Sequence, residues 1–353
     1  MTMTLERPLT RPQPTRPMTF GPNWFASVMG TGIVATAAAT LPHQVRGLHT
    51  FALGVWVLAA VMLVALTAAT AAHWVLLRAQ ARSYLSDRVA GHFYGAPAMA
   101  VLTVGAGTLL LGRDLIGLNA ALVIDWVLWI LGTAGGLACA ALVPYVAFTR
   151  HDNPPDAAFG GWLMPVVPPM VSATTGALLA EHLAAGQLRE TLVSLCWSMF
   201  GLSLVASTIV ITLVWGRLAR HGVGAAAAVP TLWIVLGPIG QSIAAANGLA
   251  GVDPSAAPLA QLYGLAAWGF ALLWLGIAIA ITTSTLRTGL PFSLAWWSFT
   301  FPVGTVVLGT SALAARTGLD LFSWAAVALY AGLVAAWAVV LLRTAANAKR
   351  LLS

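Results

Sequence analysis

The chain has 353 residues, of which 59% are hydrophobic and only 8% are charged, and its formal net charge is +7. A soluble domain carries about 25% charged residues to cover its surface, so this composition excludes an ordinary soluble enzyme or nucleic-acid-binding protein. The sequence predicts an all-α integral membrane protein.

Ten segments are long and apolar enough to be transmembrane helices, each of which needs about 20 apolar residues. They are predicted near 21–41, 50–77, 93–112, 118–147, 158–180, 191–216, 226–250, 258–285, 292–314 and 321–343. Strands are not expected, because barrel strands alternate polar and apolar residues over about ten positions. We expect a cytoplasmic N-terminal tail over 1–20, a ten-helix transport domain over 21–343 and a short cytoplasmic C-terminal tail over 344–353.

Arginine and lysine are unequally divided between the two sets of loops. The loops that follow odd-numbered spans hold four of the 17, namely Arg46, Arg113, Arg189 and Arg316. Because loops rich in Lys and Arg stay in the cytoplasm, we expect both termini to be cytoplasmic and the protein to be a multi-pass component of the cell membrane.

Proline distinguishes the odd-numbered spans from the even-numbered ones. Within spans it falls centrally only in the third, fifth, seventh and ninth, at Pro97, Pro165, Pro168, Pro169, Pro238 and Pro302. The first span has Gly30 and Gly32 at the equivalent depth. Proline interrupts the helical hydrogen bonds, and in lipid the freed carbonyls need protein or water partners. We therefore expect breaks at Gly30, Pro97, Pro165, Pro238 and Pro302.

A weak repeat accompanies these breaks, because an aromatic residue precedes each of them by three to six positions. This pattern predicts five tandem helical hairpins, with the odd helices as an inner pore-lining ring and the even helices as an outer ring. Small polar residues replace charges in the central parts of the odd spans, where they serve close packing or a weakly polar conduit. Besides the glycines and prolines Gly30, Gly32, Pro97, Pro165, Pro168, Pro238 and Pro302, the predicted anion path contains Thr31, Thr103, Ser172, Gln241, Ser242 and Thr305.

Two ionisable residues lie within even-numbered spans, His73 and Asp125. An intramembrane ionisable residue is a functional candidate by default. Both are candidates for proton coupling, and the alternative for both is a structural role, by snorkelling or by pairing with a neighbouring helix.

Three stretches resemble the tellurite-resistance/dicarboxylate transporter family: PNWFASVMGTGIV at 22–34, WLMPVVP at 162–168 and WWSFTFPVG at 296–304. That family includes plant slow anion channels, bacterial TehA-type proteins, fungal malate carriers and fungal sulfite efflux pumps. The resemblance implies five hairpins around a pore, assembly as homotrimers with one pore in each protomer, and a phenylalanine in the ninth span that plugs the pore. Phe301 takes that position here, followed by Pro302 where the TehA type has glycine.

The expected function is therefore transport of a small anion, either a C4-dicarboxylate such as malate or sulfite or another small inorganic anion, through a central pore occluded by Phe301. No cofactor, metal or nucleic-acid partner is expected. The alternatives are a membrane-embedded enzyme and a haem-binding respiratory anchor. The sequence has no motif typical of clustered catalytic groups, and among the histidines only His73 is placed to ligate haem.

Overall fold

The computed structural model describes residues 20–352, and this part of the chain forms helices without any strand. The N-terminal tail expected over 1–20 lies, apart from Phe20, outside the described residues. Within the described residues, eight helical segments are long and apolar enough to cross a membrane. They are Leu48–Leu76, Ala90–Ile116, Leu118–Arg150, Gln187–His221, Ala226–Val252, Pro254–Thr288, Leu294–Thr317 and Asp320–Ala346.

The other two predicted spans are helical but shorter. Span 21–41 contains α1, Phe25–Thr40, of 16 residues, and span 158–180 contains α7, Pro168–Ala180, of 13 residues. At a rise of 1.5 Å per residue these helices measure about 24 and 20 Å. Each of the ten predicted positions is thus helical, and eight of them meet the length expected of a spanning helix.

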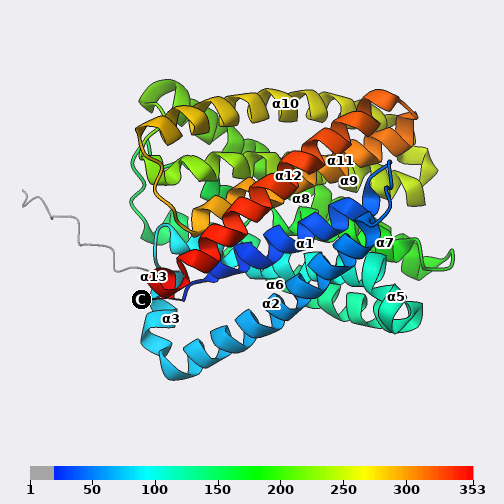
Figure 1. Ribbon diagram of the computed structural model, residues 1–353, viewed down its shortest axis with the longest axis horizontal. Helices are drawn as coiled ribbons and strands as arrows, with labels where there is room; N and C mark the ends of the chain where they lie inside the picture. The colour runs from blue at the N-terminus through cyan, green and yellow to red at the C-terminus, as the bar shows by residue number, and fades with distance from the viewer. Residues whose placement is uncertain (1–19, 353) are drawn as a thin grey trace, which may run out of the picture.

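The principal helices of the bundle fall into two groups that differ in burial. The exposed helices are α2 (Leu48–Leu76), α6 (Leu118–Arg150), α8 (Gln187–His221), α10 (Ala257–Thr288) and α12 (Asp320–Ala346), and 22–28% of their most apolar stretches is buried. The buried helices are α1, α4 (Gly95–Gly107), α7, α9 (Leu236–Val252) and α11 (Phe301–Thr317). The segments that contain α4, α9 and α11 are 72–83% buried. In Figure 1, α2 and α10 lie at opposite edges of the bundle, with α1, α9 and α11 between them.

Every buried helix is preceded by a short 3-10 segment. These segments are Pro22–Trp24, Ala90–Tyr94, Gly160–Leu163, Ala226–Val235 and Leu294–Phe299. The prolines lie at or just before the start of the α-helical part, where the backbone N–H has no helical partner and proline is tolerated. Pro168 is the first residue of α7, Pro302 the second of α11, and Pro97 and Pro238 the third of α4 and α9.

The break predicted at Gly30 is wrong, because α1 runs without interruption from Phe25 to Thr40. The glycine instead permits close packing: a methyl group at Gly30 would overlap Thr300 Oγ1 and lie 2.7 Å from the Trp297 ring. Gly32 plays the same role toward α4, where a methyl group would lie 2.8 Å from Cγ2 of Thr103.

The buried helices contact one another in a definite order. Helix α1 packs against α4, α4 against α7, α7 against α9, α9 against α11, and α11 against α1. Each of them also packs against the long exposed helix that follows it in the chain, so that α1 pairs with α2, α4 with α6, α7 with α8, α9 with α10 and α11 with α12. The chain is therefore arranged as successive pairs of one buried and one exposed helix.

Each exposed helix donates a side-chain hydrogen bond to a backbone carbonyl of a buried segment. The pairs are Trp56 with Val104 (3.3 Å), Trp129 with Ser172 (2.9 Å), Ser203 with Val166 (2.6 Å), Trp274 with Leu232 (2.8 Å) and Tyr330 with Val34 (3.2 Å). A carbonyl without a partner in lipid is costly. Val166 and Leu232 lie in the irregular or 3-10 backbone before α7 and α9, so at these two positions the donors satisfy carbonyls of interrupted backbone.

Candidate functional site

A cavity of about 470 Å³ opens among the C-terminal halves of the buried helices, and we call it the Arg316 cavity. All five buried helices contribute to its wall. Its polar lining residues are Thr36, Thr40, Thr103, Thr174, Thr175, Glu181, Gln241, Asn247, Ser311 and Arg316. The wall thus combines hydroxyl and amide groups with one arginine and one carboxylate.

Two buried side chains in this wall have unsatisfied polar atoms within the described part of the chain. They are Oε1 of Gln241 and Oγ of Ser311, in side chains 2% and 4% exposed. The guanidinium of Arg316, by contrast, is fixed by Asn247, to whose Oδ1 its Nε donates (3.3 Å) and to whose carbonyl its Nη2 donates (2.8 Å). Partial burial raises the pKa of Glu181 above its usual value, and the neighbouring His182 acts in the opposite direction.

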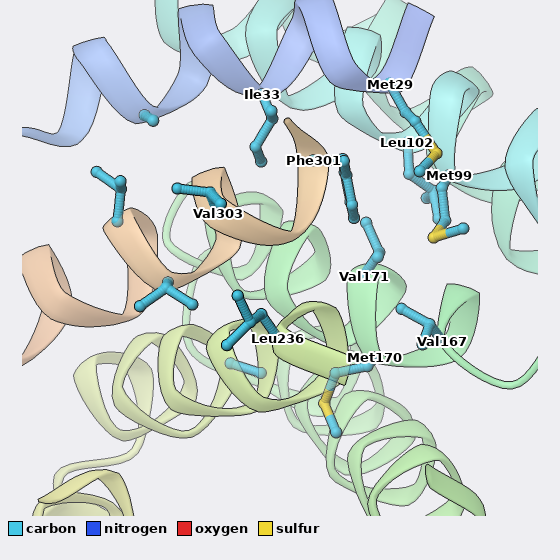
Figure 2. Close-up of a cluster of buried hydrophobic side chains, with 14 of the residues drawn as sticks. Met29, Ile33, Met99, Leu102, Val167, Met170, Val171, Leu236, Phe301 and Val303 are labelled. Atoms are coloured by element: carbon cyan, nitrogen blue, oxygen red, sulfur yellow. The ribbon is translucent and has the colours of Figure 1, made fainter. Parts of the chain in front are cut away.

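A much smaller cavity lies around Phe301, which is itself 2% exposed. This Phe301 pocket measures about 20 Å³, roughly the room that one water molecule needs. Figure 2 shows the Phe301 ring pointing toward Val171, with Met29 and Met99 facing it across the pocket. A pocket of this volume is too narrow for a hydrated ion. Its wall is almost wholly apolar, so it also offers an ion few polar contacts.

The Phe301 pocket lies one helical turn from the Arg316 cavity. In four buried helices or their leading turns, a residue of the pocket precedes a residue of the cavity by four positions. The pairs are Met29 and Ile33, Met99 and Thr103, Val167 and Val171, and Gly237 and Gln241. Four residues correspond to about 6 Å along a helix, so the two cavities are neighbours along the helix axes.

A third cavity, of about 550 Å³, lies on the other side of the Phe301 pocket, and we call it the Arg217 cavity. It shares Phe93 and Leu294 with the pocket. Its polar lining residues are Asn23, Asp156, Arg217, His221, Thr231 and Ser293. These residues come from the starts of the buried segments and the end of α8, the end of the bundle at which both described termini lie (Figure 1).

The structure brings some of the predicted path residues together and separates others. Thr103 and Gln241 line the Arg316 cavity, and Phe301 and Pro302 line the Phe301 pocket. The remaining predicted residues line none of these three cavities: Gly30, Thr31, Gly32, Pro97, Pro165, Pro168, Ser172, Pro238, Ser242 and Thr305.

Several of these remaining residues make contacts between helices. Thr31 accepts a hydrogen bond from Nε1 of Trp337 (3.2 Å), and Ser172 accepts one from Thr133 (2.9 Å). Pro238 and Ser242 line a separate groove of about 290 Å³ against α8 and α10. In that groove the Tyr263 hydroxyl donates to Oγ of Ser242 (2.6 Å).

The two intramembrane ionisable residues also lie away from the three cavities. His73 stacks on Tyr84 with ring centroids 5.9 Å apart. Asp125 is 1% exposed and faces Gly105 of α4, and both of its carboxylate oxygens lack a hydrogen-bond partner among the described residues.

Sequence reasoning missed most of the polar residues that line these cavities, among them Asn23, Glu181, Arg217, Asn247 and Ser311. Asn247 and Ser311 lie inside predicted spans, and their polarity in an apolar run is a signal that could have identified them. Sequence reasoning treats Arg217 only as one of the cytoplasmic arginines, because nothing in its spacing separates it from Arg220.

Comparison with known proteins identifies the kind of molecule to which these cavities belong. The chain is 27% identical over 328 residues to an uncharacterized transporter of Methanocaldococcus jannaschii, which covers 92% of each protein. It is 26% identical over 307 residues to the sulfite efflux pump SSU1 of Trichophyton rubrum, which covers 83% of this chain and 81% of that protein. The family model described as voltage-dependent anion channel (SLAC1) matches residues 19–345. These relatives are transporters and channels rather than enzymes, and the chain belongs to the voltage-dependent anion channel family.

Proposed function

We propose that the protein conducts small anions across the membrane along a path from the Arg217 cavity, through the Phe301 pocket, to the Arg316 cavity. The observation that carries the proposal is the order of these spaces, in which two polar cavities flank a pocket that holds about one water. Phe301 occupies that narrowest point and acts as the gate. An apolar constriction of this kind blocks ions by volume and by excluding water.

The architecture in this proposal is a ring of five buried helices inside five exposed ones. The closed order of contacts, from α1 through α4, α7, α9 and α11 back to α1, supports it. Helices α1 and α7 cross the membrane together with the 3-10 segments that precede them, which gives ten spans within 21–343. The loop arginines orient both terminal tails toward the cytoplasm, and the apolar faces of the exposed helices meet lipid or neighbouring protomers in a trimer.

The chemistry of the path suits weak anion binding. The Phe301 pocket is lined by residues in the first turns of three helices, Ala26 of α1, Gly237 of α9 and Phe301 of α11. Helix N-termini carry partial positive charge and stabilise anions without a formal charge in the membrane. Amides and hydroxyls of the Arg316 cavity extend this environment, and binding remains weak enough for the ion to leave.

The substrate class in this proposal is a small oxyanion, sulfite or a C4-dicarboxylate such as malate. The similarity to the sulfite efflux pumps of Trichophyton rubrum and Arthroderma otae supports sulfite. The direct test is flux from liposomes containing sulfite, malate or chloride, with and without a pH gradient. Flux above that of protein-free liposomes is expected for the oxyanions. Absence of flux in both the wild type and Phe301→Ala would contradict the proposal.

A second candidate is proton-coupled transport through Asp125. The observation that favours it is a buried carboxyl group that has no hydrogen-bond partner among the described residues. An ionisable group in a membrane is costly and is therefore a functional candidate by default. In that case Asp125→Asn retains anion exchange but loses the dependence of flux on the pH gradient. Unchanged pH-gradient dependence in a folded Asp125→Asn protein rules this mode out.

A further inference from the structure

Arg217 is a buried cation with an incomplete set of partners. It lies near the C-terminal end of α8, is 8% exposed and lines the Arg217 cavity. Its Nη1 donates to the carbonyl of Val223 (2.9 Å), whereas its buried Nε has no partner among the described residues. No carboxylate of the described chain lies within ion-pair distance of it. A buried charge left in this way is unfavourable unless a ligand completes it.

The turn after α8 is shaped to hold this guanidinium. Gly222 and Gly224 adopt φ angles of +74° and +76°, which favour glycine. A methyl group at Gly224 would also lie 2.8 Å from Nη1 of Arg217. The Gly222–Val223–Gly224 turn therefore brings the Val223 carbonyl to one edge of the guanidinium, and the absence of a side chain at position 224 leaves the room that Nη1 fills.

The two arginines of the path differ in which edge of the guanidinium is occupied. Arg316 donates from Nε and Nη2 to two oxygens of Asn247, so the edge of its guanidinium that can bind two oxygens at once is already occupied. Arg217 is held only through Nη1, and its Nε–Nη2 edge has no protein partner in the described chain. Two parallel N–H donors match the two oxygens of a carboxylate or a similar oxyanion.

We propose that Arg217 is an oxyanion-loading residue, whose Nε–Nη2 edge binds two oxygens of a sulfite or carboxylate ion before the ion reaches Phe301. This inference rests on the proposed function. The exposed carboxylate of Asp156 lines the same cavity and opposes tight binding, which favours release toward the pocket. A monatomic halide can meet both N–H donors only with a single atom, whereas an oxyanion places one oxygen on each, so Arg217 favours oxyanions over chloride.

The test compares sulfite and chloride flux through three variants, each also made in the Phe301→Ala background. Arg217→Lys keeps the charge and loses the paired donors, and its sulfite-to-chloride flux ratio is expected to fall about tenfold. Arg217→Gln lowers both fluxes and lowers sulfite more. The matched control is Arg220→Gln, an exposed arginine one turn further along α8, which leaves the ratio unchanged.

An equal sulfite-to-chloride flux ratio in the wild type and in a folded Arg217→Lys protein would overturn the inference. An equal loss of sulfite and chloride flux in Arg217→Gln, together with a lower melting temperature, would also overturn it, because that result marks a purely structural arginine. Gly224→Ala crowds the guanidinium without removing it and is expected to shift the ratio in the same direction. Calorimetric titration of the detergent-purified protein with sulfite separates the proposal that Arg217 binds oxyanions from the proposal that the protein conducts anions. Sulfite binding that Arg217→Lys weakens supports this inference even if no flux is found, and sulfite binding that is unaffected by Arg217→Lys rejects it.

Discussion

The buried and exposed helices are both strongly apolar, yet they differ in the continuity of their backbone. The exposed helix α6 runs for 33 residues and continues through Pro144. The buried helix α11 has 17 residues and begins where a 3-10 segment ends. A lipid-facing helix must satisfy its backbone groups internally, whereas a helix inside the bundle can borrow partners. The buried helices that line the proposed path therefore differ from the exposed helices around them in backbone interruption more than in hydropathy.

The exposed helices supply these partners. Trp274 of α10 donates to the carbonyl of Leu232, within the 3-10 segment before α9, and Trp129 of α6 donates to that of Ser172 in α7. The indole thus acts as a fixed donor that enters the interrupted layer from outside. The variants below test this division of roles, from the largest expected effect to the smallest.

Phe301→Ala tests whether the buried layer contains the gate. Removing the ring enlarges a pocket that now holds about one water, so anion flux from liposomes should rise by an order of magnitude or more. Phe299→Ala is the control, because its ring packs on Trp233 (centroids 5.2 Å apart) and does not line the pocket. It should lose at most about 3–5 kcal/mol of stability without opening a path. A rise in Phe299→Ala alone would place the gate two residues earlier.

Gly30→Ala tests the close packing of the buried layer. The new methyl group overlaps Thr300 and approaches Trp297, so the free energy of unfolding should fall by about 3 kcal/mol. The matched control is Gly54→Ala in exposed helix α2, where no atom lies within 4 Å of the new methyl. That change should be neutral or stabilising by about 0.5–1 kcal/mol. Similar melting temperatures for the two variants in detergent would refute the distinction.

Trp274→Phe tests the donors that link the two layers. It leaves the buried carbonyl of Leu232 without its indole partner, and the expected loss is about 1–2 kcal/mol. Trp324→Phe, on the exposed face of α12, should cost less than about 0.5 kcal/mol. Chemical unfolding of both proteins measures the difference, and equal losses would mean that the carbonyl bond is dispensable.

Glu181→Gln gives the smallest expected effect. Burial raises the pKa of Glu181, so acidification neutralises its charge earlier than that of a free glutamate and makes the Arg316 cavity more positive. Wild-type anion flux should therefore rise as pH falls through that pKa, by about twofold because water screens the charge. Glu181→Gln should be flat over this range, whereas Glu190→Gln, in the first turn of α8, should behave as wild type. A pH response that persists in Glu181→Gln would assign it to another group.

The ten helical positions were predictable because each depends on a long apolar run, which is visible in the order of residues along the chain. The direction in which an individual side chain points within the bundle was not predictable from the sequence. Thr103 and Thr31 are both threonines in odd-numbered spans, yet Thr103 lines a cavity and Thr31 bonds to Trp337. Which side of a helix faces the centre depends on neighbours far away in sequence. Gly30 likewise appeared to be a break because its partner, Thr300, is known only from the fold.

The hydrogen bond from Tyr330 to the carbonyl of Val34 joins residues 296 positions apart, and α1 also contacts α11 and α12. The first helix therefore depends on partners that are synthesised late, after all the other buried helices. We therefore expect the early helix pairs to enter the membrane with one flank uncovered and the bundle to close only after α12 has left the ribosome. A chaperone or insertase that shields the α1 flank during that interval would be needed most by chains truncated before Tyr330.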